Sequence, residues 1–123
     1  YAYKVDKLDG GEKEAAEGVA FSAGVLPRIH AASSSAAKTI YDNTKVGASS
    51  TDFAEVKVAF ESVYADMGLT CGDIGGLWNE GEKDYYPGAE PCTDVSTESS
   101  GSTSMRVLSW AAVALPAIVL AVL

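Results

Sequence analysis

The sequence predicts a mainly α-helical fold, a small helical bundle fragment followed by a disulfide-tethered C-terminal loop, a Ser/Thr-rich stalk and a hydrophobic tail. Apolar residues recur at steps of three and four in three stretches, which is the spacing of one helix face. Residues that cap helices precede two of these stretches. The composition then changes abruptly after Cys92. We therefore divide the chain into a helical part (1–92), a Ser/Thr/Gly-rich linker (93–104) and a hydrophobic tail (105–123).

The strongest helix signal lies in residues 51–68. Thr51 and Asp52 supply an N-cap, and Glu55 stands where the partner of a capping box is expected. Gly68 readily adopts the left-handed conformation that closes a helix. Between the two ends, one helix face is predicted to carry the apolar residues Phe53, Val56, Phe60, Val63 and Met67.

A second helix is predicted from Glu12 onward, after Gly10-Gly11 break the chain. Acidic residues fill its first turns, where they favour the positive end of the helix dipole. Pro27 is expected to kink or end it. The acids are Glu12, Glu14 and Glu17, and the predicted apolar stripe comprises Ala16, Val19, Ala20, Ala23 and Leu26.

A third helix is predicted over residues 36–45, with Ser33-Ser34-Ser35 supplying its N-cap. Its spacing predicts that Ala37, Ile40 and Tyr41 are buried on one side. Residues 1–9 are compatible with a short strand or with the tail of a helix, and the sequence does not distinguish the two.

Residues 69–92 contain too much Gly, Asp and Pro for a long regular element. A short helical turn is predicted at Asp73-Ile74. Leu77 and Trp78 are expected to pack onto the helices. Residues 79–90 are predicted to form a polar loop with a turn at residues 85–88.

Cys71 and Cys92 bracket this region, and neither belongs to a Cys-x-x-Cys pair. With one His in the chain, the soft ligands are too few for a zinc site. One structural disulfide in an oxidising compartment is the simplest interpretation. The alternative is two unrelated free thiols in a cytosolic protein.

The net charge is −8, from 17 acidic and 9 basic residues. The chain has no Lys/Arg cluster that would neutralise phosphates, which argues against nucleic acid as a partner. An acidic surface suits solubility, or cations held by oxygen ligands. No phosphate-binding loop, Ser/His/Asp order or His-x-x-x-His pair is present, so we predict a protein that is not an enzyme.

The last part of the chain suggests membrane attachment. Residues 107–123 contain no charged residue. We expect a glycolipid-anchor signal, with attachment at Ser99, Ser100 or Gly101 and the hydrophobic tail removed. A retained single-span anchor is the alternative, although the segment is short and contains Pro116. Either anchor would hold the helical part outside the plasma membrane.

A family resemblance covers residues 1–92. Its blocks are, in order, YAYKVD, GGEKEAAEG, FSAGVLPRIHA, AAKTIYDN, KVGASSTDFAEVKVAFESVYADMGLTCGDIGGLWNEG and YYPGAEPC. They resemble the C-terminal part of the algal iron-assimilation proteins, also described as low-iron-inducible or high-CO2-inducible periplasmic proteins. The resemblance implies a secreted, non-catalytic protein that assists iron uptake at the cell surface, with an iron permease as a partner. It also implies a large preceding N-terminal portion, which the small residues 16–23 are expected to contact.

Ferric iron is a hard cation that prefers carboxylate and phenolate oxygens and accepts imidazole. The constellation that we predict for an iron contact is Asp84, Tyr85, Tyr86 and Glu90, with His30 as a separate candidate. The competing interpretations are an ordinary surface loop for the first four residues and a helix-end cap for His30. The acids of the second helix are interpreted as solvated helix-start residues.

A second functional hypothesis is a structural cell-wall or adhesion protein that binds partners or glycans and has no metal role. A component of inorganic-carbon acclimation is a third, suggested only by the other name of the family.

Overall fold

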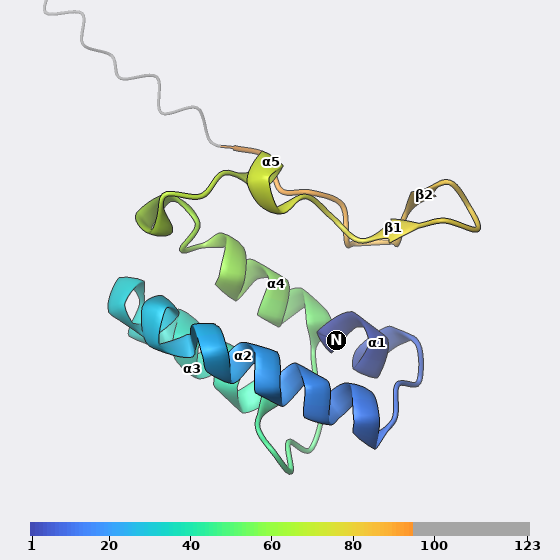
Figure 1. The fold of residues 1–123 in the computed structure, drawn as a ribbon, viewed down its shortest axis with the longest axis horizontal. Helices are drawn as coiled ribbons and strands as arrows, with labels where there is room; N and C mark the ends of the chain where they lie inside the picture. The colour runs from blue at the N-terminus through green and yellow to red at the C-terminus, as the bar shows by residue number, and fades with distance from the viewer. Residues whose placement is uncertain (95–123) are drawn as a thin grey trace, which may run out of the picture.

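The computed structural model describes residues 1–94, which form a bundle of helices crossed by an extended C-terminal arm (Figure 1). We define the arm as residues 69–94. The mainly helical fold predicted from the sequence is confirmed. The elements, in order, are α1 (Ala2–Lys7), α2 (Glu12–Ala32), α3 (Ser34–Thr44), α4 (Phe53–Glu61), the 3-10 helix η1 (Ala65–Met67), α5 (Cys71–Ile74), β1 (Trp78–Asn79) and β2 (Asp84–Tyr85).

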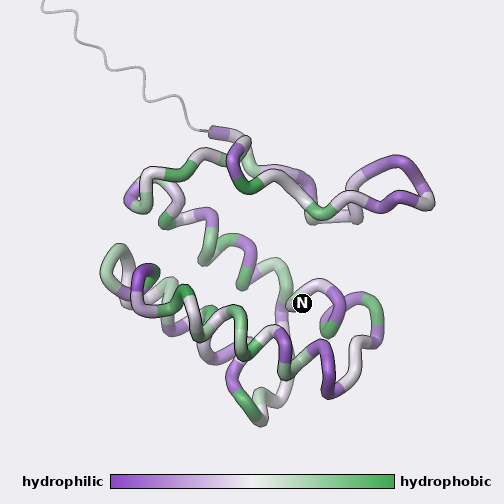
Figure 2. Tube along the Cα trace, viewed as in Figure 1, coloured by the Kyte–Doolittle hydropathy of each residue, from purple (hydrophilic) through white to green (hydrophobic). Residues whose placement is uncertain are grey.

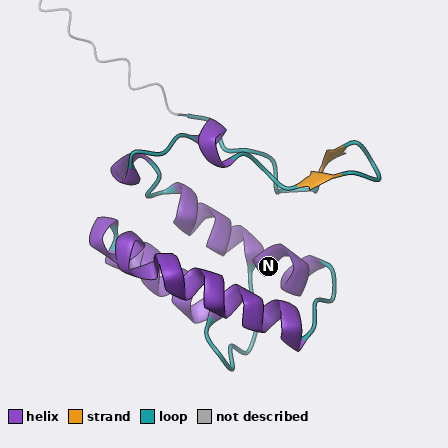
Figure 3. Cartoon of the chain, viewed as in Figure 1, coloured by secondary structure: helices purple, strands orange, loops and turns teal. Residues whose placement is uncertain are grey.

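The strands form a two-stranded antiparallel hairpin at the far end of the arm (Figure 3). Hydrophilic residues dominate this hairpin, whereas the bundle helices alternate hydrophilic and hydrophobic residues (Figure 2). This alternation is typical of helices that bury one face. The core therefore lies in the bundle.

The core is small and is centred on Ile29 of α2, Ile40 of α3 and Val63, which follows α4. These side chains are 0%, 0% and 1% exposed. Ala36, Ala37 and Ala59 complete the buried cluster. Because alanine side chains are short, they let the helix axes approach closely around the isoleucines.

Helix α1 resolves the ambiguity of residues 1–9 in favour of a helix. Gly10 lets the chain turn back on α1, because a Cβ atom there would lie 2.8 Å from the carbonyl oxygen of Lys4. The N–H of Gly10 donates to that same oxygen. The predicted break at Gly10-Gly11 is confirmed, and α2 begins directly after it.

Two sequence predictions for α2 need correction. Pro27, which we expected to kink or end the helix, does not end it, and the helix continues to Ala32 because Ile29 is anchored in the core. Pro27 and Ala23 are both exposed, so water can bond the Ala23 carbonyl that Pro27 leaves unpaired. The second concerns the buried face. Helix α2 buries Ser22 and Ile29, and of the predicted stripe Leu26 packs half-buried against the core and Val19 is half-buried, whereas Ala16, Ala20 and Ala23 are exposed.

The pattern of apolar residues did not reveal the buried face of α2, because Ser22, one of the two buried residues of that face, is polar. The Oγ atom of Ser22 lies 3.0 Å from Oγ1 of Thr44, and this hydrogen bond joins α2 to α3. Ser22 also donates to the carbonyl of Val19. A buried hydroxyl with such partners costs little to bury.

Ser33 caps α3 as predicted, and its Oγ accepts the N–H of Ala36 at 3.2 Å. Ala37 and Ile40 are buried as predicted, but Tyr41 is 52% exposed, so that part of the prediction is wrong. The Tyr41 ring instead lies beside the ammonium group of Lys45, 5.5 Å from its centroid. This cation–π contact holds the ring at the surface.

Helix α4 begins as predicted, with Asp52 Oδ1 accepting the N–H of Glu55 at 3.0 Å. The capping box is not completed, because the N–H of Asp52 donates to Oδ1 of Asn43 and not to Glu55. The helix also ends earlier than predicted, at Glu61. The hydroxyl of Ser62 bonds back to the carbonyl of Ala59, which competes with the regular helix.

The remainder of the predicted helix is a turn followed by η1, which closes at Gly68 with φ of 72°. Val63 and Met67 still face the core, so the predicted apolar face persists beyond the regular helix.

Replacing Asp52 with alanine is expected to lower the free energy of unfolding by about 1 kcal/mol, because the Glu55 N–H loses its cap. Asp52→Asn keeps an oxygen acceptor and is the matched control. Urea unfolding of the two variants measures the difference. Equal stability of Asp52→Ala and the parent chain would contradict this role.

A second carboxylate supports α4 from a distance. Oδ2 of Asp6, on α1, accepts the N–H of Phe53 at 2.9 Å. This backbone hydrogen bond, together with the neighbouring ammonium group of Lys7, lowers the pKa of Asp6 below its ordinary value of 3.8. The stabilisation is therefore fully present above that ordinary value and is lost as the pH falls through the lowered pKa.

The variant Asp6→Asn, which keeps an acceptor oxygen but no charge, is expected to have a lower melting temperature than the parent chain at neutral pH. The difference is expected to close in acid, once Asp6 is protonated. Thermal melts across the acid range test this. A difference that is constant with pH would assign the effect to packing.

Candidate functional site

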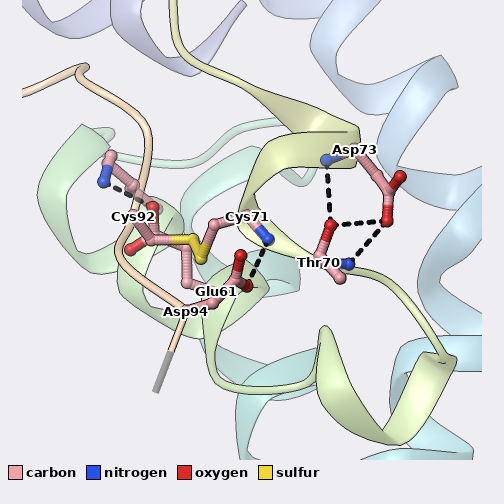
Figure 4. Close-up of a disulfide and its surroundings, with 7 residues drawn as sticks. Glu61, Thr70, Cys71, Asp73, Cys92 and Asp94 are labelled. Carbon is pink, nitrogen blue, oxygen red and sulfur yellow. Dashed lines mark hydrogen bonds and ion pairs between the residues drawn. A yellow bond between two sulfur atoms is a disulfide. The ribbon is translucent and has the colours of Figure 1, made fainter. Parts of the chain in front are cut away.

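The arm carries most of the predicted site residues, and its base is fixed by a disulfide. Cys71 and Cys92 are bonded, with their Cα atoms 5.2 Å apart, as the sequence predicted (Figure 4). Cys71 is 8% exposed. The disulfide therefore joins the two ends of the arm at one partly buried point.

Helix α5 is capped from two directions beside this disulfide (Figure 4). Thr70 and Asp73 form a reciprocal capping box, and the pKa of Asp73 is lowered because the hydroxyl and N–H of Thr70 both donate to its carboxylate. Oδ1 of Asp94 accepts the N–H of Cys71 at 2.7 Å. The predicted helical turn at Asp73-Ile74 is confirmed, and the end of the described chain is held against it.

The hairpin beyond α5 was predicted only as a polar loop. The N–H of Tyr86 donates to the carbonyl of Leu77, and the N–H of Leu77 donates to the carbonyl of Ala89. The turn runs over residues 86–89, one residue later than predicted, with Pro87 second and Gly88 third at φ of 75°. This order is typical of a type II turn.

The structure spreads the four predicted iron-contact residues of the arm. Tyr85 pairs across the hairpin with Trp78, and their rings meet edge to face at 5.2 Å. The neighbouring Asp84 pairs with Asn79, so its side chain belongs to the opposite face. Tyr86 instead leans on Tyr3 of α1, with ring centroids 5.1 Å apart.

Glu90 lies beyond the turn, where Oε1 accepts the N–H of Gly88 at 3.3 Å. The side chains of Asp84, Tyr85, Tyr86 and Glu90 therefore share one hairpin and its turn without forming one inward-facing ligand set. Tyr86 has a structural task as well: its contact with buried Tyr3 anchors the arm to the bundle.

His30 lies apart from these residues. It is exposed near the C-terminal end of α2, whereas the hairpin extends from the opposite end of the bundle (Figure 1). It lines a shallow groove with residues of α2 and α3, including Ser34, Lys38 and Tyr41. The structure does not bring His30 to the hairpin.

Within residues 1–94, no three side chains of His, Cys, Asp or Glu are grouped closely enough to share a metal ion. Of the four predicted iron-contact residues, Asp84 and Glu90 are exposed, and Tyr85 and Tyr86 are half-buried.

Leu77 and Trp78 do not pack onto the helices as expected; they are 44% and 45% exposed. The reason is the unpredicted hairpin, in which the partner of Trp78 is Tyr85.

Sequence reasoning also missed Asp6, Asn43 and Asp94 as capping residues. Each is a short polar residue, but its partner lies 47, 9 or 23 positions away, which local patterns do not reveal.

The predicted lipid-attachment residues Ser99, Ser100 and Gly101 and the hydrophobic tail lie outside the described residues. Among the helices of residues 1–94, none is long and apolar enough to cross a bilayer.

Comparisons with protein-family models, with curated proteins and with solved structures find no match to this chain.

Proposed function

We propose that this chain is the C-terminal helical part of an extracellular or periplasmic iron-assimilation protein, which binds or concentrates iron at the cell surface for uptake without catalysis. The observation that supports it best is the Cys71–Cys92 disulfide. Structural disulfides are typical of oxidising compartments outside the cytosol. The iron role rests on the family resemblance of residues 1–92, and attachment to the plasma membrane rests on the apolar tail.

The charge of the arm suits this role. Lys83 is its one basic residue, and its ammonium group is paired with Glu80 at 2.7 Å. The acidic residues of the arm are Asp73, Glu80, Glu82, Asp84, Glu90 and Asp94. Exposed carboxylates beside phenols attract a hard cation and release it readily, which fits concentration of iron and transfer to a permease.

The exposed alanines of α2 are the surface that we propose for contact with the N-terminal portion that the resemblance implies. Ala16, Ala20 and Ala23 are all exposed on the bundle. Small side chains permit close approach of a second helix.

Substitution at the hairpin tests the placement of iron. We expect Asp84→Asn combined with Glu90→Gln to weaken ferric binding by about tenfold or more, since each change removes an anionic ligand. Calorimetric titration of the full chain with ferric citrate measures this. The matched control is Glu55→Gln with Asp66→Asn, which removes two exposed acids from the bundle.

A further variant, Tyr85→Phe with Tyr86→Phe, tests the phenol oxygens through loss of the visible ferric-phenolate absorption band. His30→Gln is expected to leave ferric binding unchanged. Binding that survives every hairpin substitution would contradict an iron contact in the arm.

The exposed aromatic pair of the hairpin favours a second candidate, a cell-wall or adhesion protein. Trp78 is 45% exposed beside Tyr85, and such rings are common in surfaces that bind partners or glycans. Two results would favour this candidate over iron assimilation. The protein would stay in the cell-wall fraction at every level of iron supply, and the variant Trp78→Ala would no longer be retained there.

A further inference from the structure

Exposed apolar side chains converge on one cleft between the bundle and the arm. Phe21 and Val25 of α2 are 64% and 39% exposed, and Ile74 and Leu77 of the arm are 51% and 44% exposed. All four line the same cleft, which has a volume of about 460 Å³. Apolar side chains that gather on one surface indicate a binding site more strongly than scattered ones.

The bundle and the arm together form the walls of this cleft. Phe53 and Phe60 of α4 line it from the bundle, and Gly75, Gly76 and Ala89 line it from the arm. The arm is held in place by the Tyr86–Tyr3 contact and, at its base, by the disulfide. Gly76 fits closely under the return strand, since a Cβ atom there would lie 2.6 Å from the Ala89 carbonyl oxygen.

The size of the cleft suits a small molecule. Ligand pockets typically measure about 300–1,000 Å³. A helix of a partner protein is about 10 Å wide and rises about 1.5 Å per residue, so even three turns would need considerably more space. A small ligand therefore fits this cleft better than a polypeptide does.

The charge of the lining indicates the chemistry of that ligand. Lys57 is the one charged side chain among the described residues that line the cleft, in a chain of net charge −8. Its ammonium group donates to Glu61, one turn further along α4. An ammonium group has three N–H donors, so two remain for a ligand.

Three hydroxyl groups of the lining, those of Ser22, Thr44 and Tyr64, carry no negative charge that would repel an anion. The hydroxyls of Ser22 and Thr44 are already hydrogen-bonded to each other. The phenol of Tyr64 stays neutral, because burial and the nearby Glu61 carboxylate raise its pKa.

We propose that this cleft binds a small amphipathic anion, such as a fatty acid or an apolar aromatic carboxylate. Its apolar body lies against Phe21, Val25 and Leu77, and its acid group pairs with Lys57. Neither the predicted iron contact nor membrane attachment involves this site.

Titration of the full, disulfide-bonded chain with decanoate tests the proposal, with displacement of anilinonaphthalene sulfonate as an independent readout. Saturable binding of one decanoate per chain is expected. Val25→Glu places a carboxylate in the cleft and is expected to weaken binding more than tenfold. The control Val58→Glu changes a residue of α4 that is 64% exposed and does not line the cleft, and it is expected to bind normally.

Lys57→Met is expected to weaken decanoate binding about tenfold, by loss of a charged hydrogen bond, while binding of neutral decanol is unchanged. Lys38→Met removes a lysine from a comparable pair with Asp42 and serves as its control. Circular dichroism verifies that every variant is folded.

Three results would overturn the proposal. The first is no saturable decanoate binding by the folded chain. The second is equal binding by Val25→Glu and Val58→Glu, which would place the ligand elsewhere, such as on the apolar tail. The third is equal weakening of decanoate and decanol by Lys57→Met, because the cleft would then select for apolarity alone.

Discussion

Amide exchange in the arm is expected to accelerate about a hundredfold when Cys71 and Cys92 are both replaced by serine. The disulfide closes a loop whose ends are 21 positions apart. By lowering the conformational entropy of the open arm, it raises the free energy of opening by about 3 kcal/mol. At about 1.4 kcal/mol per factor of ten, this corresponds to roughly two orders of magnitude. The amides that report it are those of Leu77, Tyr86 and Ala89, which hold the hairpin together.

Helices α2 and α3 provide the internal control for this experiment. Both cysteines belong to the arm, so exchange of amides around Ile29 and Ile40 is expected to change much less. Hydrogen exchange followed by mass spectrometry resolves the two regions. Equal acceleration in the bundle and the arm would contradict a locally acting disulfide, and no acceleration would show that Tyr86 holds the arm unaided.

Truncation of Ile40 to alanine is expected to lower the free energy of unfolding by about 3–4 kcal/mol. Ile40 is 0% exposed and packs with Ile29, Ala59 and Val63 at the centre of the only buried cluster in the described residues. In a core this small, such a loss is a large fraction of the total stability.

Two matched substitutions make the result interpretable. Ile40→Val removes a single methylene and is expected to cost about 1 kcal/mol. Val46→Ala changes a side chain that is 86% exposed and is expected to have an effect within about 0.5 kcal/mol. Urea unfolding measures all three variants, and a loss for Ile40→Ala as small as that for Val46→Ala would contradict the assignment of the core.

Helix caps and apolar spacing predicted much of the bundle. Ser33 and Asp52 begin helices because their side-chain oxygens accept N–H groups three residues ahead, a local arrangement that the sequence displays directly. The same spacing identified Val56 and Val63 as buried positions. Local rules sufficed where the interaction is itself local.

The errors arose where distant contacts decide the outcome. Helix α2 continues through Pro27 because Ile29 is buried beyond it, and its inward face depends on a bond between Ser22 and Thr44. Neither contact is visible in a periodic pattern of apolar residues. The exposure of Tyr41 is an exception, since its partner Lys45 is only four residues away.

The candidate site was predictable in part. The cysteine pair and the turn near Pro87 followed from residue type, and both are present. The hairpin was not predicted, because its strands are only two residues long and carry no alternation to read. As a result the sequence grouped Asp84, Tyr85 and Tyr86 as neighbours, whereas the hairpin directs the two tyrosine rings to Trp78 and Tyr3.

The most direct test of the proposed function is equilibrium dialysis of the full, disulfide-bonded chain against ferric citrate at neutral pH. Our account predicts that the chain retains iron in a fixed ratio to protein, and that Asp84→Asn with Glu90→Gln releases it. The bundle control Glu55→Gln with Asp66→Asn is expected to retain as much iron as the parent chain, because its hairpin acids are unchanged. A parent chain that retains no iron at all would contradict the account, and the wall or adhesion role would then be the better proposal.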